Sequence, residues 1–334
     1  MLNLPAGRDF VERLGLRMPH RRAPSGSPRI AVLGNCQASA IGRAMRLLCP
    51  GAEVRFVSAG TLGRNRLRPD QLVMDLSGFD VVFAQRITSR HLGPEHYAAL
   101  AERGKGFSPM PAFVFAAFHP DLVYVGGPGT RNPAFVDSPV GHYHSALALY
   151  GYLAGLTADE TIRLFRREVY EHLGYLDLWG YAQETLVALG RDAGMDLEGS
   201  VVRWARRGCF MHSVNHPKMF VLVDIAKMLL EAAGLPFRDD DLESLLIDDL
   251  SLKGMWPVYD PVARHYGVPG SMMFQAQALD SRSRKPGQVF TLADLVVGSF
   301  ERYRALPRSA LASDRVETWL TSDQLGAAFR SWAA

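Results

Sequence analysis

The stretch RIAVLGNCQASAIGRAM, residues 29–45, decides the fold class that we predict for this chain. An apolar run over residues 30–33 has the character of a buried strand, and the polar sequence GNCQ at residues 34–37 ends it. A helical pattern then runs over about residues 37–48. A strand that passes through a short polar turn directly into a helix is typical of a βαβ unit.

The same alternation continues through the first half of the chain. Further strands are expected over residues 54–58, 80–84 and 112–118, and HLGPEHYAALAER, residues 91–103, has helical character. Strands that alternate with helices favour a parallel sheet covered on both faces. We therefore predict an α/β fold with a doubly wound, mostly parallel, flavodoxin-like sheet.

The pattern changes along the chain and suggests three regions. Residues 1–28 form a basic N-terminal arm and linker, and residues 29–235 form the α/β catalytic domain. A helical insertion at about residues 137–207 interrupts that domain, and one of its helices opens with Thr157 as a cap and Glu160 three residues later. Residues 208–212 are expected as a fifth strand, followed by a helix that begins near His216. Residues 236–334 are expected to be mainly helical, with a solvated acidic helix in DDDLESLLIDDL, residues 239–250, and two final helices near residues 291–304 and 313–332.

The composition of the chain argues against several classes of function. A formal net charge of +3 is too small to argue for a nucleic-acid partner, and no apolar run approaches the ~20 residues that span a bilayer. The first 27 residues lack the apolar core of a signal peptide. Three widely spaced cysteines give no disulfide framework or zinc motif, so a cytoplasmic location without a bound metal is expected. Walker and GxGxxG motifs are absent.

Polar side chains follow several of the expected strands. They are Asn35, Cys36 and Gln37; the arginine loop with Arg64, Arg66 and Arg68; Gln85 and Arg86; His119 and Asp121; and Ser213, Asn215 and His216. Ligands of parallel sheets bind at the carboxyl ends of the strands. We therefore expect one shared site built from these groups.

Cys36 is the candidate nucleophile of this site. It lies where the backbone N–H groups of a helix N-terminus favour the thiolate, and a histidine can take the proton of the thiol. Its neighbours Asn35 and Gln37 favour this interpretation over a small cysteine that packs the turn. Cys49 and Cys209 lack such a setting and are expected in the core.

Two histidines precede prolines at expected strand ends, and they are the candidate bases. Proline fixes the local chain, which helps to hold His119 and His216 in place. Asp121 is positioned to orient His119 or to cap the next segment. The arginine loop could bind phosphates, and an ordinary solvated loop has equal weight from the sequence alone.

Together these segments resemble the WcbI family of polysaccharide-biosynthesis proteins. The shared features are GNCQ, FHPD at residues 118–121, the helical YHSALALYGYLAGLTADETIRLF and SVNHP at residues 213–217. The resemblance covers about residues 29–235 and implies coenzyme A binding and acetyl transfer. It places the family's cysteine at Cys36 and its histidines at His119 and His216.

The layout also resembles that of SGNH hydrolases, in which a nucleophile follows the first strand and a late Asp-x-x-His supplies the base. Here Cys36 would replace the serine, and Ser213-Val214-Asn215-His216 would replace the Asp-x-x-His. The aspartate is missing, so another group would have to orient His216.

The leading hypothesis is an acyltransferase that moves an acetyl group from acetyl-CoA to a sugar hydroxyl in capsular or other surface polysaccharide. The expected cofactor-binding residues are Asn35, Gln37, Arg64, Arg66, Gln85, Arg86, Asp121, Ser213 and Asn215. Cys36, His216 and His119 are the expected catalytic residues. An esterase that uses the same side chains and a non-catalytic nucleotide- or glycan-binding protein remain alternatives. The expected partners are a CoA thioester and a sugar acceptor, and a homo-oligomer is left open.

Overall fold

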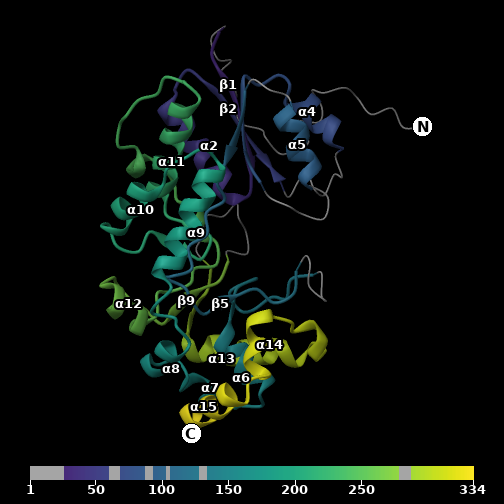
Figure 1. Cartoon of the computed structure of the whole chain (residues 1–334), viewed down its shortest axis with the longest axis vertical. Helices are drawn as coiled ribbons and strands as arrows, with labels where there is room; N and C mark the ends of the chain where they lie inside the picture. The colour runs from purple at the N-terminus through teal and green to yellow at the C-terminus, as the bar shows by residue number, and fades with distance from the viewer. Residues whose placement is uncertain (1–25, 60–67, 87–92, 103–105, 128–133, 278–286) are drawn as a thin grey trace, which may run out of the picture. The chain divides into compact units, whose positions relative to one another are not determined.

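The computed structural model of the chain describes residues 26–59, 68–86, 93–102, 106–127, 134–277 and 287–334 (Figure 1). The chain divides into two compact units. Unit 1 contains the described residues up to Ala112 together with Asp192–Met195 and Met219–Ile247; unit 2 contains Phe113–Arg191, Asp196–Lys218 and Asp248–Ala334. This division differs from the predicted one, because segments on both sides of residue 235 belong to each unit.

Unit 1 is built on a four-stranded parallel sheet. Its strands are β1 (Arg29–Gly34), β2 (Glu53–Ser58), β3 (Val81–Gln85) and β4 (Phe107–Met110), in the order β2-β1-β3-β4. Ile30 of β1 pairs with Val54 on one side and Val81 on the other. This order is that of the first four strands of a flavodoxin-like sheet. The predicted doubly wound α/β fold is confirmed.

Helices cover both faces of this sheet (Figure 1). α2 (Cys36–Leu48) and α11 (Met219–Ala232) lie on one face, and α4 (Pro69–Leu76) and α5 (Pro94–Glu102) lie on the other. The core on the α4 and α5 side contains Ala31, Leu33, Val57, Leu72, Leu76, Val82, Ala84, Tyr97 and Leu100. Because side chains alternate along a strand, Ile30 and Val32 are available to the α2 side, where Gly42 comes close to Val32.

The fourth strand lies earlier in the chain than the sequence suggested. β4 covers Phe107–Met110, and the expected strand over residues 112–118 is wrong. β4 is an edge strand, which tolerates the missing N–H of Pro109. Phe115 and Phe118 pack instead against Phe210 in an aromatic core of unit 2, with ring centroids 4.7 and 5.3 Å away. Apolar runs fit a strand or a packed core segment equally well.

Unit 2 is mainly helical with short strand pairs. Its helices are α6 (Ala146–Leu153), α7 (Ala158–Ile162), α8 (Arg167–His172), α9 (Trp179–Asp192), α10 (Glu198–Ala205), α12 (Asp260–Tyr266), α13 (Leu292–Arg304), α14 (Asp314–Leu320) and α15 (Asp323–Ala333). Its strands are β5 (Leu122–Val123), β6 (His144–Ser145), β7 (Met211–Ser213), β8 (His216–Pro217), β9 (Met273–Gln275) and β10 (Val289–Thr291). The predicted Thr157 and Glu160 capping box opens α7.

Three expectations for this part of the chain need correction. β7 pairs antiparallel with β8 rather than joining the parallel sheet as a fifth strand. The acidic stretch near residue 245 forms the short 3₁₀ turns η1 (Glu243–Leu245) and η2 (Asp249–Leu252) instead of an α-helix. The last expected helix is split into α14 and α15, because Ser322 caps a new helix through the backbone N–H of Leu325.

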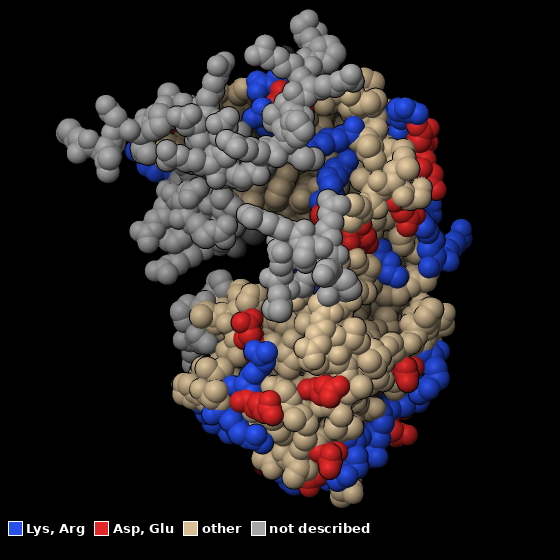
Figure 2. Space-filling view, turned by 180° about the vertical axis from the view of Figure 1, so that it is seen from behind, with Lys and Arg blue, Asp and Glu red and all other residues tan. Residues whose placement is uncertain are grey.

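Two further observations concern the surface and membrane contact. In the part of the chain that the structure describes, no helix has the length and apolar character needed to cross a bilayer. Acidic and basic side chains are interspersed over much of the described surface in Figure 2. The N-terminal arm before residue 26 lies outside the described residues.

Candidate functional site

The turn between β1 and α2 is held by a buried network of amide groups. Oε1 of Gln85, at the end of β3, accepts the backbone N–H of Asn35 at 3.0 Å. Nε2 of Gln85 donates to Oε1 of Gln37 at 3.0 Å and to the carbonyl of Pro111 at 3.1 Å. Gln85 and Gln37 are 0% and 1% exposed. The ends of β1 and β3 therefore meet, and these two amides hold the turn in shape.

Cys36 is the first residue of α2, directly after the cap. The side-chain oxygen of Asn35 accepts the backbone N–H of Gln37 at 2.9 Å, which fixes the start of the helix. The first turn of α2 contains no acidic residue, so the helix N-terminus keeps its attraction for negative charge. Cys36 is half-buried. β1 and β3 are the strands at which the direction of winding reverses, and ligands of such sheets bind there.

Replacing Gly34 with alanine should destabilise unit 1. A Cβ at this position would lie 2.3 Å from Oε1 of Gln85 and 2.7 Å from Cβ of Ala38. We expect Gly34→Ala to lower the free energy of unfolding by about 1–3 kcal/mol, as other overpacked sites do. Urea unfolding measures this change. Gly51→Ala is the control, because nothing lies within 4 Å of its Cβ; equal losses in the two variants would contradict the close packing of Gln85.

Alkylation kinetics should distinguish Cys36 from the other two cysteines. Burial raises the pKa of the Cys49 thiol and the pKa of the Cys209 thiol. A thiol whose burial disfavours the thiolate reacts more slowly, so we expect iodoacetamide to label Cys36 several-fold faster than Cys49 and Cys209 at neutral pH. Peptide mass spectrometry over time reads the three rates. Equal rates in the folded protein would argue against an activated Cys36.

The predicted phosphate-binding arginines are described only in part. Arg64 and Arg66 lie outside the described residues, so their predicted role stays a prediction. Arg86 directly follows β3 and is exposed. Arg68 is exposed at the start of α4, and its guanidinium contacts Asp70 at 3.0 Å.

The β7–β8 turn of unit 2 brings three predicted site residues together around Tyr143. The Tyr143 hydroxyl lies 2.5 Å from Oδ1 of Asn215, and Oγ of Ser213 lies 3.0 Å from it. Both ring nitrogens of His216 are 3.3 Å from the same hydroxyl. Nδ2 of Asn215 donates to the Tyr124 hydroxyl at 3.0 Å. Sequence reasoning missed both tyrosines, which lie about 70 or more residues away from their partners.

Burial keeps His119 and His216 uncharged. The pKa of His119 falls to about 3, mainly because of burial; His212, Lys218 and His216 add to the lowering, and the backbone of Trp256 opposes it. Burial likewise lowers the pKa of His216 to about 4, with Asp248 opposing the change. A neutral imidazole can accept a proton, which is the state that a general base requires.

A second pair, His212 and Asp248, was not predicted. Nε2 of His212 lies 2.7 Å from Oδ2 of Asp248, and the two side chains are 10% and 25% exposed. Asp248 belongs to the acidic stretch that the sequence suggested was a solvated helix. The His-x-x-x-His spacing of residues 212 and 216 was the only available signal.

Asp121 caps a helix in the interior of unit 2. Its Oδ1 accepts the backbone N–H of Leu147 in the first turn of α6 at 3.0 Å and the Tyr175 hydroxyl at 3.1 Å. Its Oδ2 accepts the Tyr259 hydroxyl at 3.0 Å. Asp121 is 0% exposed, and burial raises its pKa to about 6. Of the two roles considered from the sequence, this is the capping role.

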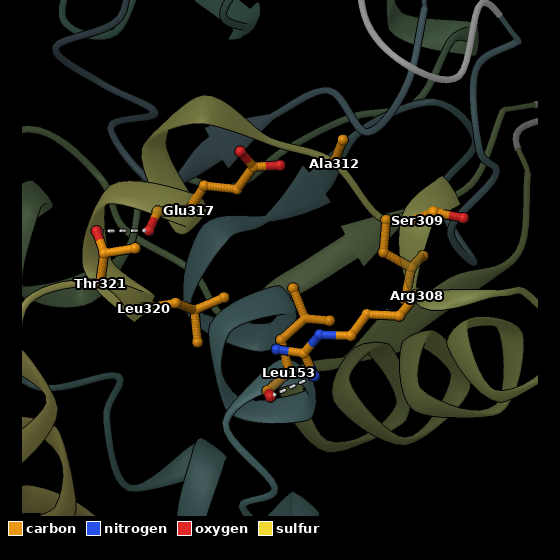
Figure 3. Close-up of a pocket in the computed structure, with 8 residues that line it drawn as sticks. Leu153, Arg308, Ser309, Ala312, Glu317, Leu320 and Thr321 are labelled. Atoms are coloured by element: carbon orange, nitrogen blue, oxygen red, sulfur yellow. Dashed lines mark hydrogen bonds between the residues drawn. The ribbon is translucent and has the colours of Figure 1, made fainter.

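Unit 2 contains a cavity of about 420 Å³ that is lined by Leu153 of α6 and by residues between 308 and 321 (Figure 3). Arg308 turns toward α6 and donates to the Leu153 carbonyl at 3.0 Å, and the hydroxyl of Thr321 donates to the carbonyl of Glu317 at 3.2 Å. The described residues that line the cavity include none of the predicted site residues. Among the described residues, no cluster of histidine, cysteine and carboxylate side chains could hold a metal ion.

The strand order and the covering helices define unit 1 as a doubly wound α/β domain. The sequence model of the family described as "Polysaccharide biosynthesis enzyme WcbI" matches residues 29–238. This match covers more than half of the chain. The chain therefore belongs to the WcbI family of polysaccharide biosynthesis enzymes, as the resemblance predicted.

A solved structure agrees with this assignment. It is described as WcbI, a novel polysaccharide biosynthesis enzyme, in its native form without a disulfide bond between coenzyme A and a cysteine. Its TM-score to this chain is 0.68 at 14% sequence identity, over 92% of this chain and 99% of that chain. At this identity the likeness shows a shared fold. None of the curated proteins matches the chain.

Proposed function

We propose that this protein is an O-acetyltransferase that moves an acetyl group from acetyl-CoA to a sugar hydroxyl in the biosynthesis of capsular or other surface polysaccharide. The observation that carries the proposal is the position of Cys36. It is the first residue of α2, after a capped turn at the switch point of a parallel sheet. Membership in a family of polysaccharide biosynthesis enzymes supports it, and so does the mention of coenzyme A and a cysteine in the description of a similarly folded protein.

The chemistry of the turn suits an anionic co-substrate. Backbone N–H groups at the start of α2 favour phosphate or a developing oxyanion, and Asn35 holds that start in place. Arg86 follows the neighbouring strand β3 as an exposed cation. We assign the phosphates of coenzyme A to Arg86, Arg64 and Arg66, with Gln37 and Gln85 as the groups that support the turn.

The proposed transfer moves one acetyl group and one proton. The bond from the acetyl carbon to the thioester sulfur breaks, and a bond to the sugar oxygen forms, either directly or through an acetyl group carried on Cys36. The sugar hydroxyl gives its proton to His216, with His119 as the second candidate, and that proton finally goes to the departing thiolate. Ser213 and Asn215 help to position these groups through Tyr143.

An assay of thiol release tests the proposal and separates it from the esterase alternative. The protein is incubated with acetyl-CoA, with and without a panel of sugars and capsular oligosaccharides, and the free thiol and the acetylated sugar are measured. We expect thiol release that needs a sugar and that is lost in Cys36→Ala, with Cys49→Ala as the control. Equal release without any sugar would instead indicate a hydrolase.

A non-catalytic role has its own signature in the same assay. Saturable binding of coenzyme A without thiol release for any sugar would favour a binding protein and overturn the proposed transfer. A cytoplasmic location and a homo-oligomer stay predictions from the sequence.

A further inference from the structure

Unit 2 collects buried polar atoms that have no hydrogen-bond partner among the described residues. Four of them are Nδ1 and Nε2 of His119, Nδ1 of His212 and Nε1 of Trp256, and the hydroxyl oxygens of Tyr170 and Ser299 are the others. His119 is 2% exposed, His212 9% and Trp256 3%. In folded proteins more than about 90% of buried polar groups find a partner. Several such groups together therefore indicate a ligand or ordered water that satisfies them.

These three residues are neighbours. The backbone N–H of Trp256 donates to the carbonyl of His212 at 3.0 Å. The ring of His119 lies beside the backbone of Trp256, and His212, Lys218 and His216 act on its charge. One local region of unit 2 therefore holds all three residues.

Asp248 decides which nitrogen of His212 carries a proton. Its Oδ2 lies 2.7 Å from Nε2 of His212, and its Oδ1 accepts the backbone N–H groups of Leu250 and Ser251 at 3.1 and 3.3 Å. A carboxylate fixed in this way requires a proton on Nε2, so Nδ1 is the ring nitrogen left to accept a hydrogen bond. Asp248 is thus a positioning residue for His212.

The four atoms form a balanced set of donors and acceptors. Nδ1 of His212 accepts, and the indole N–H of Trp256 donates. His119 is buried and neutral, so one of its ring nitrogens donates and the other accepts. The region offers two donors and two acceptors, and Lys218 is the cation that acts on His119.

We propose that His119, His212 and Trp256 form a binding site for a pair of sugar hydroxyls, with the His212 tautomer set by Asp248. Each hydroxyl donates one hydrogen bond and accepts another, so two hydroxyls match the set. A phosphate or carboxylate offers acceptors alone and fits poorly. This inference rests on the proposed function and identifies where the acceptor sugar binds.

The test follows the indole N–H signal of Trp256 by NMR during titration with methyl α-D-glucopyranoside, its galacto and manno isomers, and permethylated methyl glucoside. Trp256→Phe assigns the signal. We expect at least one glycoside with free hydroxyls to shift it saturably and the permethylated sugar to leave it unchanged. Asp248→Asn should weaken the binding of that glycoside at least tenfold.

A matched control uses another histidine–aspartate pair of unit 2. Nδ1 of His142 lies 3.0 Å from Oδ1 of Asp137, and both side chains are exposed. Asp137→Asn should leave sugar binding unchanged. If Asp248→Asn does not fold, His119→Gln is titrated instead and should weaken sugar binding in the same way. The titration of the wild type does not depend on either variant.

Two outcomes would overturn the proposal: no shift with any of the three glycosides, or equal sugar affinity in the wild type and the folded Asp248→Asn variant. Calorimetry with coenzyme A on the same samples separates the two proposals. Sugar binding without coenzyme A binding would refute the acetyltransferase and leave the hydroxyl site standing. Coenzyme A binding without sugar binding would refute the hydroxyl site and leave the proposed acetyltransferase standing.

Discussion

His216→Gln should lower the turnover rate of acetyl transfer by about 10²- to 10⁴-fold, which is the contribution typical of a general base. The ring is 7% exposed and contacts the Tyr143 hydroxyl, which Ser213 and Asn215 hold in place. Glutamine keeps a similar size and polarity but cannot take up the proton. The measurement is the turnover rate with saturating acetyl-CoA and sugar.

The pH profile gives this prediction a second readout. Because burial lowers the pKa of His216 to about 4, the ring stays neutral at pH 7 and gains a proton only well below that pH. We expect the wild-type rate to hold as the pH falls toward 5 and to decline below it. His142→Gln is the control, since the side chain of His142 is 54% exposed. A His216→Gln variant with the wild-type rate and pH profile would show that His216 is not the general base. His119→Gln would then be the next variant to measure.

Unit 2 should lose stability steeply as the pH falls below 6.5. Burial lowers the pKa of His119 to about 3 and the pKa values of His144 and His216 to about 4. Their usual pKa is 6.5. The unfolded chain therefore binds three protons that the folded unit excludes over most of the range from pH 6.5 down to 4. Stability from these groups is complete above pH 6.5 and is lost with acid.

Asp121 acts in the opposite direction. Burial raises its pKa from 3.8 to about 6, so the folded unit holds a proton there between these values and releases it on unfolding. Three protons taken up and one released leave a net uptake of two near pH 5. The free energy of unfolding should then fall by about 3 kcal/mol per pH unit, since each proton contributes about 1.4 kcal/mol.

Urea unfolding of the intact protein at pH 7, 6 and 5 measures this slope. His144 is a suitable probe, because its ring nitrogens contact the Tyr303 hydroxyl at 2.8 Å and the Val136 carbonyl at 2.9 Å inside unit 2. His144→Gln should reduce the net uptake from two protons to one. Equal stability at pH 7 and pH 5 would contradict the neutral buried histidines.

The parts of the fold that local sequence determines were predictable. The run before Gly34 and the cap at Asn35 specify a strand, a turn and a helix within twenty residues, and Thr157 with Glu160 specifies a helix start. The conformation of residues 112–118 was not predictable, because an apolar residue such as Phe115 is equally compatible with a buried strand and with a packed aromatic core. Unit membership was not predictable either, since each unit combines segments that are distant in the sequence.

The candidate site shows the same limit. Cys36, His119 and His216 were singled out because each follows a short motif. The proposed role of His212 depends on its contact with Asp248. Asp248 lies 36 residues away, in an acidic stretch that the composition alone suggests is solvated. Tyr143 likewise reaches Ser213 across 70 residues. Contacts of this kind depend on tertiary folding and leave no local pattern.

Calorimetric titration with coenzyme A tests the central claim most directly. The wild type is compared with Arg64→Ala, Arg86→Ala and Cys36→Ala, and with Arg167→Ala, whose guanidinium pairs with Glu171 on an exposed face of α8. We predict saturable binding by the wild type, at least about tenfold weaker binding in one of the first two arginine variants, and no change in Arg167→Ala. No binding by the folded wild type, or equal affinity in all the arginine variants, would contradict the assignment of coenzyme A to this protein.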